Sequence, residues 1–197
     1  MNNRNLLYGF LFISLWFLFV LYPNPIKLTQ SIYRIFNYST CSVSVEEITK
    51  EVSGKNPKEI ESYILNQIKY DYDWNVYGYP WYFPKAEEVI KNQKGDCKSR
   101  FIVIASVFDY LQIPYELSMS LTHIWIDYQE KEETVIENNK VRLYSQSKGL
   151  EFPEIDWQES KKTFIQAFWD CMPQSKKTLL LTGPLFFMAL INITKRR

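Results

Sequence analysis

The chain has 197 residues, enough for one domain with a core of ordinary size, and 17% of them are aromatic. The 23 lysines and arginines nearly balance the 22 aspartates and glutamates, which argues against a nucleic acid as partner. Any imidazole base must be His123, because the chain has one histidine. The three cysteines form no Cys-x-x-Cys pair, which argues against a zinc site or a dithiol redox motif.

The N-terminal segment reads as a membrane anchor. Residues 5–22 carry no charge and are long enough, at ~1.5 Å per residue, to cross most of a bilayer core of ~30 Å. Tyr8, Trp16 and Tyr22 would lie at the interfaces. A cleaved signal peptide is the alternative, but no small-x-small cleavage site follows. We therefore predict an uncleaved anchor over residues 1–23, ahead of a domain over residues 24–175.

The first part of that domain is predicted to be helical. Residues 23–43 read as a loop or a short amphipathic link, and two helices are expected at 44–52 and 56–70. The second helix opens with an N-cap, a proline at the first helical position and an acidic residue as in a capping box: Asn56, Pro57 and Glu59.

The centre of the chain is a helix that Asp96 is expected to cap. An aromatic loop over residues 71–84 and a short helix over residues 86–93 precede it. Within residues 97–111, apolar side chains at helical spacing predict one core-facing stripe: Phe101, Ile104, Ala105, Phe108 and Leu111. Cys97 lies on the same face in the first turn, where unpaired N–H groups and the helix dipole favour a thiolate. Alternatively, Cys97 is a small buried hydrophobe.

After residue 115 the pattern changes to the alternation typical of strands. Strands are predicted at residues 115–121, 122–128, 134–137 and 141–144, followed by a helix at 157–170. Thiol catalysis needs an imidazole near the thiol and a polar group that orients the imidazole. With a turn centred near residues 130–131, His123 would lie opposite Glu137 or Asn138, whereas Asp127 on its own strand is a poorer partner. Alternatively, His123 is an ordinary core or surface histidine.

The C-terminal segment, like the N-terminal one, is uncharged and largely apolar. Residues 178–194 carry no charge, span about 25 Å as a helix and contain Gly183-Pro184. We predict a transmembrane segment within residues 176–197, with a buried or interfacial helix as the alternative. Lysines and arginines beside the two segments give no orientation, but long domains translocate largely regardless of charge, so we expect the domain to be extracytoplasmic.

Several of these features together resemble a known family. Lys94-Gly-Asp-Cys97 opens an apolar helix, Ile113-Pro114 ends it, and His123-Ile-Trp-Ile-Asp127 follows. This order resembles the transglutaminase-like superfamily of papain-type thiol enzymes, over roughly residues 45–140. The resemblance implies an α+β fold with a cysteine at a helix N-terminus packed on an antiparallel sheet. It also implies Cys97 as nucleophile, His123 as base and then acid, and Glu137 as the third catalytic residue.

The chain departs from the family pattern at two points. Glu137-Asn138-Asn139 stands where the family commonly has Asp-Pro, which keeps Asn138 open as the orienting residue, and Gln112 replaces the usual glycine. The oxyanion donor is open as well. The backbone N–H of Cys97 is one candidate; the other candidates are Trp74, Trp81 and Gln93.

The sequence thus predicts a membrane-anchored thiol enzyme, either a peptidase or a transglutaminase-type acyltransferase, that acts on a protein or peptide amide through a thioester. The flanking anchors resemble bacterial membrane-bound members of the superfamily. No metal or cofactor is expected, since Cys97 and His123 are too few ligands for zinc. The alternative is a non-catalytic, membrane-anchored binding or assembly module that keeps the fold. In an extracytoplasmic domain Cys41 and Cys171 are expected to form a disulfide, leaving Cys97 as the free thiol.

Overall fold

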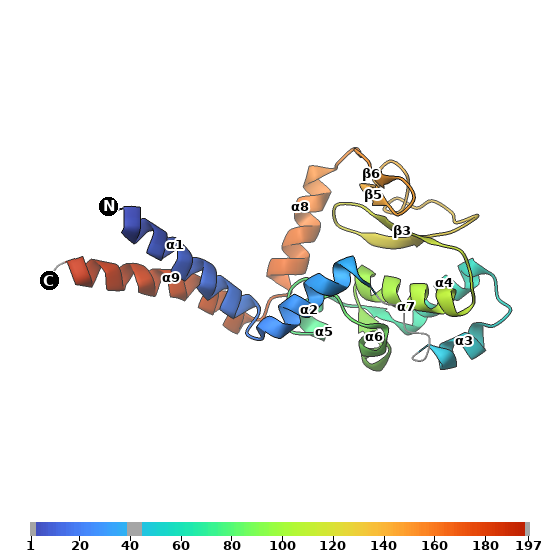
Figure 1. Ribbon diagram of the computed structural model, residues 1–197, viewed down its shortest axis with the longest axis horizontal. Helices are drawn as coiled ribbons and strands as arrows, with labels where there is room; N and C mark the ends of the chain where they lie inside the picture. Colours follow the sequence, from blue (N-terminus) through green and yellow to red (C-terminus); the bar gives the residue numbers. More distant parts are fainter. Residues whose placement is uncertain (1–2, 39–44, 196–197) are drawn as a thin grey trace.

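The structure, a computed structural model, describes residues 3–38 and 45–195. It has a mixed α+β architecture, which agrees with the fold class predicted from the sequence. A small sheet and several short helices enclose one central helix, and two long helices project from this domain (Figure 1). In chain order the elements are α1 (Asn3–Leu21), α2 (Pro25–Phe36), α3 (Glu46–Val52), α4 (Pro57–Gln67), β1 (Lys69–Tyr70), α5 (Asp73–Val76), α6 (Ala86–Asn92), β2 (Lys94–Gly95), α7 (Cys97–Tyr110), β3 (Glu116–Met119), β4 (Ile124–Asp127), β5 (Tyr144–Ser145), β6 (Gly149–Leu150), α8 (Trp157–Ile165), the π-helical turn η1 (Gln166–Asp170) and α9 (Gln174–Lys195).

Helix α7 is the centre of the core. Asp96 caps it as predicted, because its carboxylate accepts the N–H groups of Lys98 and Ser99. Every residue over 101–108 is buried, so the predicted single apolar stripe is too narrow. The reason is that α3, α4 and α6 pack on one side of α7 and strand β4 packs on another (Figure 1).

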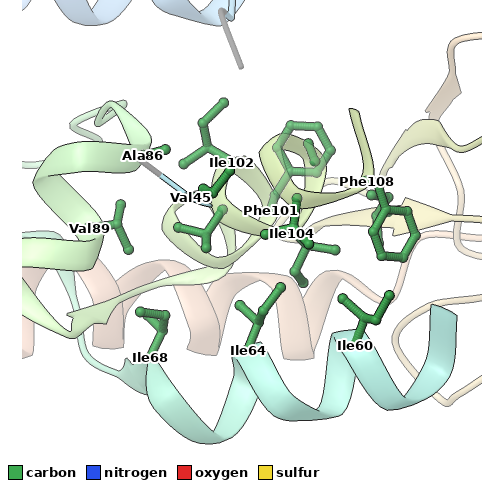
Figure 2. Close-up of a cluster of buried hydrophobic side chains, with 14 of the residues drawn as sticks. Val45, Ile60, Ile64, Ile68, Ala86, Val89, Phe101, Ile102, Ile104 and Phe108 are labelled. Carbon is green, nitrogen blue, oxygen red and sulfur yellow. The ribbon is translucent and has the colours of Figure 1, made fainter. Parts of the chain in front are cut away.

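Helix α4 shows how the neighbouring helices meet α7. Ile60, Ile64 and Ile68 all point from the α4 segment toward α7, where they meet buried side chains such as Phe101 and Phe108 (Figure 2). The predicted capping box at the start of α4 is confirmed. The helix ends at Gln67 rather than at residue 70 because Lys69 and Tyr70 form strand β1, which pairs in parallel with β2.

The sheet has the order β4-β3-β5-β6, and every neighbouring pair is antiparallel. The strands predicted near 115–121 and 122–128 are confirmed, in shorter form. The strand predicted at residues 134–137 is wrong, and the one predicted at 141–144 shrinks to β5. Residues 134–137 need no partner strand because their turn is closed locally: the N–H of Thr134 donates to the Glu137 carbonyl at 2.9 Å.

The long helices α1 and α9 lie side by side and run in opposite directions, so α1 begins where α9 ends (Figure 1). Trp16 joins them, because its indole N–H donates to the Leu179 carbonyl at 2.9 Å. It also packs so closely on Gly183 that a β-carbon there would lie 2.0 Å from Trp16 Nε1. Phe12 and Phe187 stack with ring centroids 4.3 Å apart.

In the described part of the chain, no single helix has both the length and the apolar composition needed to cross a membrane. The stretch Leu7–Leu21 of α1 reaches that length and composition only together with α2, and an 82° bend separates the two. Residues 23–43 are predicted to be a loop or a short amphipathic link. In the structure, Pro25–Phe36 of this segment form a regular helix, which Asn24 caps and Pro25 begins.

Candidate active site

Cys97 is the first residue of α7, as the cap at Asp96 predicts. Gly95, two residues earlier, lets the chain approach the helix closely. A β-carbon at this glycine would lie 2.1 Å from the β-carbon of Ser99, which is fully buried. The pairing of Tyr70 with Gly95 holds the strand that leads into the helix. Cys97 is therefore fixed by a cap, a close backbone approach and a strand pair.

The Asp96 cap leaves one donor of the helix start unused. Its carboxylate accepts the N–H groups of Lys98 and Ser99, whereas the N–H of Cys97 donates to no group in the described part of the chain. A free N–H at a helix N-terminus is suited to an anionic oxygen. The oxyanion role predicted for the Cys97 N–H needs a donor that is free in this way.

His123 lies in the tight turn that joins β3 to β4. Its N–H donates to the Ser120 hydroxyl at 3.1 Å, and its carbonyl accepts the Ser120 N–H at 2.8 Å. The imidazole stacks on Trp125, with centroids 5.9 Å apart and an interplanar angle of 15°. The turn and the stacking together restrict the ring to one orientation.

Glu137 is the residue that meets the imidazole. Its Oε1 lies 2.8 Å from His123 Nε2, in a half-buried environment. Because Nε2 is engaged in this way, Nδ1 is the ring nitrogen left for Cys97. Burial lowers the pKa of His123, but interactions with Cys97 and Glu137 outweigh it and raise that pKa to about 9. Burial alone would raise the pKa of Glu137, but His123 and the ammonium of Lys131 lower that pKa below its usual value.

The other two candidate partners of His123 are engaged elsewhere. The amide of Asn138 donates to the carbonyls of Thr134 and Val135, inside its own turn. Asp127 lies 3.6 Å from the guanidinium of Arg142. Of the three acidic or amide residues considered from the sequence, Glu137 is the one that contacts the imidazole. It does so from a turn rather than from the predicted strand.

Lys131 contacts Glu137 in this site, and the sequence did not indicate it. Its almost buried ammonium lies 2.9 Å from Glu137 Oε2 and 2.8 Å from Glu61 Oε1, and donates to the Ile126 carbonyl at 2.7 Å. The sequence around Lys131 reads as a charged, solvated turn. Glu61 lies 70 residues away, on α4, so no local pattern indicated the contact.

A cleft of about 1120 Å³ contains these groups. Its walls come from α4, α7, the β3–β4 turn, β4, the following loop and α8, and Cys97, His123 and Glu137 all line it. Tyr70 lies beside Cys97 in the same cleft, where burial, followed by the charge of Cys97, raises the pKa of its phenol. The phenol therefore stays protonated next to the thiol.

The three side chains considered as oxyanion donors lie elsewhere, since none of them is among the described residues that line the cleft. The indole N–H of Trp74 donates to the Phe168 carbonyl at 2.9 Å. Trp81 stacks on Phe168 at 4.8 Å. Gln93 takes the left-handed conformation that ends α6. Trp74 and Trp81 thus pack against Phe168 of η1, and Gln93 lies at the end of α6, so the structure does not bring these three side chains into the cleft.

A second charged cluster supports the start of α7. The ammonium of Lys98 contacts Asp96 and lies 3.0 Å from Asp73 Oδ2. Burial raises the pKa of Asp73 to about 7. Burial opposes the charge of Lys98, but Asp96 and Asp73 outweigh it and raise its pKa. The cluster ties the aromatic loop to the turn that carries Cys97.

Two sequence predictions concern metals and disulfides. Among the described residues, no three His, Cys, Asp or Glu side chains are grouped as metal ligands. The predicted disulfide includes Cys41, which lies outside the described residues, and Cys171 is a free thiol in the structure.

No protein-family model matches the chain, and no curated protein matches its sequence. The function is therefore inferred from the residues that line the cleft.

Proposed function

We propose that the chain is a membrane-anchored thiol enzyme with a transglutaminase-like, papain-type core, which hydrolyses or transfers acyl groups from protein or peptide amides. One observation carries the proposal. His123 Nε2 lies 2.8 Å from Glu137 Oε1, in the cleft that Cys97 lines from the N-terminus of a buried helix. A thiol, an imidazole and a carboxylate in this order are the parts of a nucleophilic triad.

In the proposed reaction, His123 Nδ1 takes the proton of Cys97, and the thiolate attacks the carbonyl carbon of the amide. The Cys97 N–H stabilises the negative oxygen of the tetrahedral intermediate. The imidazolium then gives its proton to the leaving nitrogen, the amine departs, and a thioester remains. His123 next deprotonates water or a second amine, which attacks the thioester and releases the thiolate. Glu137 keeps the imidazole oriented and stabilises its charged form throughout.

The size of the cleft supports a polymeric substrate. Pockets for small ligands commonly have volumes of about 300–1,000 Å³, and this cleft holds about 1120 Å³. It also continues past the triad to α8, where Glu159 and Thr163 line it. A cleft that is lined from the triad to α8 has room for a peptide segment.

The helices α1 and α9 support the membrane part of the proposal. Their outer surfaces expose large apolar side chains, such as Phe10 at 69% and Phe186 at 66%. A contiguous apolar surface of this kind is costly in water and is typical of contact with lipid. We expect the protein to stay in the membrane pellet after alkaline carbonate extraction; release into the supernatant would contradict the anchor.

We also propose that the domain is extracytoplasmic. Phe152 is fully exposed, so a cysteine introduced there would meet any reagent on its side of the membrane. We expect a membrane-impermeant maleimide added to intact cells to modify the Phe152→Cys variant above the level of the unchanged chain. Labelling only after the cells are permeabilised would reverse this orientation.

The test of the triad is the pH dependence of Cys97 alkylation by iodoacetamide, followed by peptide mass spectrometry. We expect Cys97 to react well below pH 7, and we expect the low-pH limb to disappear in His123→Ala. Cys171 is a matched control in the same sample, because burial raises its pKa and no imidazole faces it. If Cys97 and Cys171 showed the same profile in both proteins, the pair would not be assembled, and a binding module would be the better description.

A further inference from the structure

Helix α2 presents its polar side to the protein and its apolar side outward. Lys27, Ser31 and Arg34 follow one another at helical spacing and face the domain. Arg34 Nη1 lies 2.9 Å from Glu88 Oε2, and Lys27 Nζ donates to the Tyr82 hydroxyl at 3.1 Å. Ser31 is almost fully buried.

Ser31 fixes this orientation of the helix. Its hydroxyl accepts the N–H of Phe83 at 2.8 Å and donates to the carbonyl of Trp81 at 3.2 Å. Both partners are backbone groups of the aromatic loop, which would otherwise remain unpaired. The polar side of α2 is therefore committed to the domain, and rotation of the helix would break each of these contacts.

The opposite side of α2 carries large apolar side chains with no protein cover. In this group Phe36 is 80% exposed, Tyr33 65%, Ile26 63% and Ile32 48%. A helix on a water-facing surface has the reverse arrangement, with its apolar stripe toward the core. The outward side of α2 therefore needs a non-aqueous environment.

The position of α2 identifies that environment. The helix follows α1 directly and makes an angle of 82° with it. If α1 crosses a bilayer, a helix at nearly a right angle to it lies along the bilayer surface. Helix α2 starts at the end of the α1–α9 pair that meets the domain (Figure 1). Both the pair and α2 expose large apolar side chains.

We propose that α2 is a membrane-surface helix whose exposed apolar side is buried in the boundary between lipid headgroups and acyl chains. The inference rests on the membrane anchor of the proposed function, but not on its chemistry. With α1 and α9 as the perpendicular anchor, α2 fixes the tilt of the domain, so that the cleft keeps one orientation to the membrane.

The test uses spin labels on the full chain in liposomes of phosphatidylcholine and phosphatidylglycerol, in a background with the native cysteines changed to serine. A label at Phe36→Cys reports on the outward side, and one at Gln30→Cys is the matched control on an exposed, polar part of the same helix. We expect oxygen, which concentrates in lipid, to relax the Phe36 label more than a water-soluble nickel chelate does. We expect the reverse at Gln30.

A third label, at Phe10→Cys on α1, separates this inference from the anchor itself. If oxygen dominates at Phe10 but the nickel chelate dominates at Phe36, the anchor stands and the surface helix is overturned. If the chelate dominates at both sites, the anchor fails and the surface helix fails with it. If neither reagent reaches the Phe36 label, protein covers this side of α2, and the lipid assignment is overturned as well.

Discussion

The ammonium of Lys131 lies 2.9 Å from Oε2 of Glu137, while His123 contacts Oε1 of the same carboxylate at 2.8 Å. Lys131 is in turn fixed by Glu61 on α4. Both oxygens of Glu137 are thus engaged, and the carboxylate cannot turn away from His123 without losing Lys131. A helix on the far wall of the cleft therefore sets the orientation of the imidazole.

Replacing Lys131 with methionine is expected to weaken both stability and reactivity. The change leaves Glu61 and Glu137 facing each other in a largely buried site, at a cost of about 3 kcal/mol of unfolding free energy. We expect Cys97 alkylation at neutral pH to slow about tenfold, because Glu137 is no longer held against His123. Lys58→Met is the control: Lys58 forms an ion pair with the exposed Glu132, and such pairs contribute ~0–1 kcal/mol. A Lys131→Met protein that folds and keeps the wild-type alkylation profile would rule out a positioning role.

Replacing Glu137 with glutamine is expected to keep the shape of the site and remove its charge. Without the carboxylate, the pKa of His123 falls, because Glu137 is one of the two groups that raise it. Cys97 alkylation at pH 6 should then drop by about tenfold or more. Glu159→Gln removes a carboxylate from the same cleft, away from the imidazole, and should leave the rate unchanged. Equal rates in the two variants would mean that the orienting residue is not Glu137.

The stability of the domain should depend on pH through His123. Its folded pKa of about 9 lies above the ordinary value of 6.5, so the charged ring stabilises the fold fully below pH 6.5. This contribution, about 3 kcal/mol, is lost as the pH rises through 9. Thermal unfolding in detergent, measured from pH 6 to 10, should show a decline in wild type that is much flatter in His123→Gln. Parallel curves for the two proteins would show that the raised pKa is absent in solution.

A methyl group at Gly95 is expected to displace the start of α7. The added β-carbon would overlap Ser99, which is part of the helix and fully buried, so the Gly95 backbone or the helix start must move. We expect Gly95→Ala to lower the unfolding free energy by ~1–3 kcal/mol and to slow Cys97 alkylation. The double variant Gly95→Ala with Ser99→Gly removes the overlap and should recover part of the alkylation rate. No recovery would place the cause outside this contact.

Local rules were enough to predict the start of the central helix. An N-cap aspartate followed by a long apolar run predicts a helix that begins at Cys97, because both signals act within a few residues. The pairing of His123 with Glu137 was also among the expected contacts. The predicted strand at 134–137 was wrong because a local turn satisfies its backbone instead.

The features that could not be predicted from the sequence depend on contacts between residues that are far apart in the chain. Lys131 reads as part of a charged turn, and only the fold brings Glu61 to it. The orientation of α2 is a similar case. Its pattern reveals an amphipathic segment, but the rule that apolar sides face the core predicts the opposite side inward. The Trp81 carbonyl and the Phe83 N–H, about 50 residues further along the chain, bind Ser31 and hold the polar side of α2 against the domain.

The antiparallel pair of α1 and α9 has a practical consequence for labelling. Because α1 begins where α9 ends, the outer ends of the two helices are neighbours at the tip of the pair (Figure 1). Complementary halves of a split fluorescent protein, one fused beyond each of these ends, would meet within a single molecule. Fluorescence from such a fusion would not vary with dilution, and it would report directly whether the two helices remain paired.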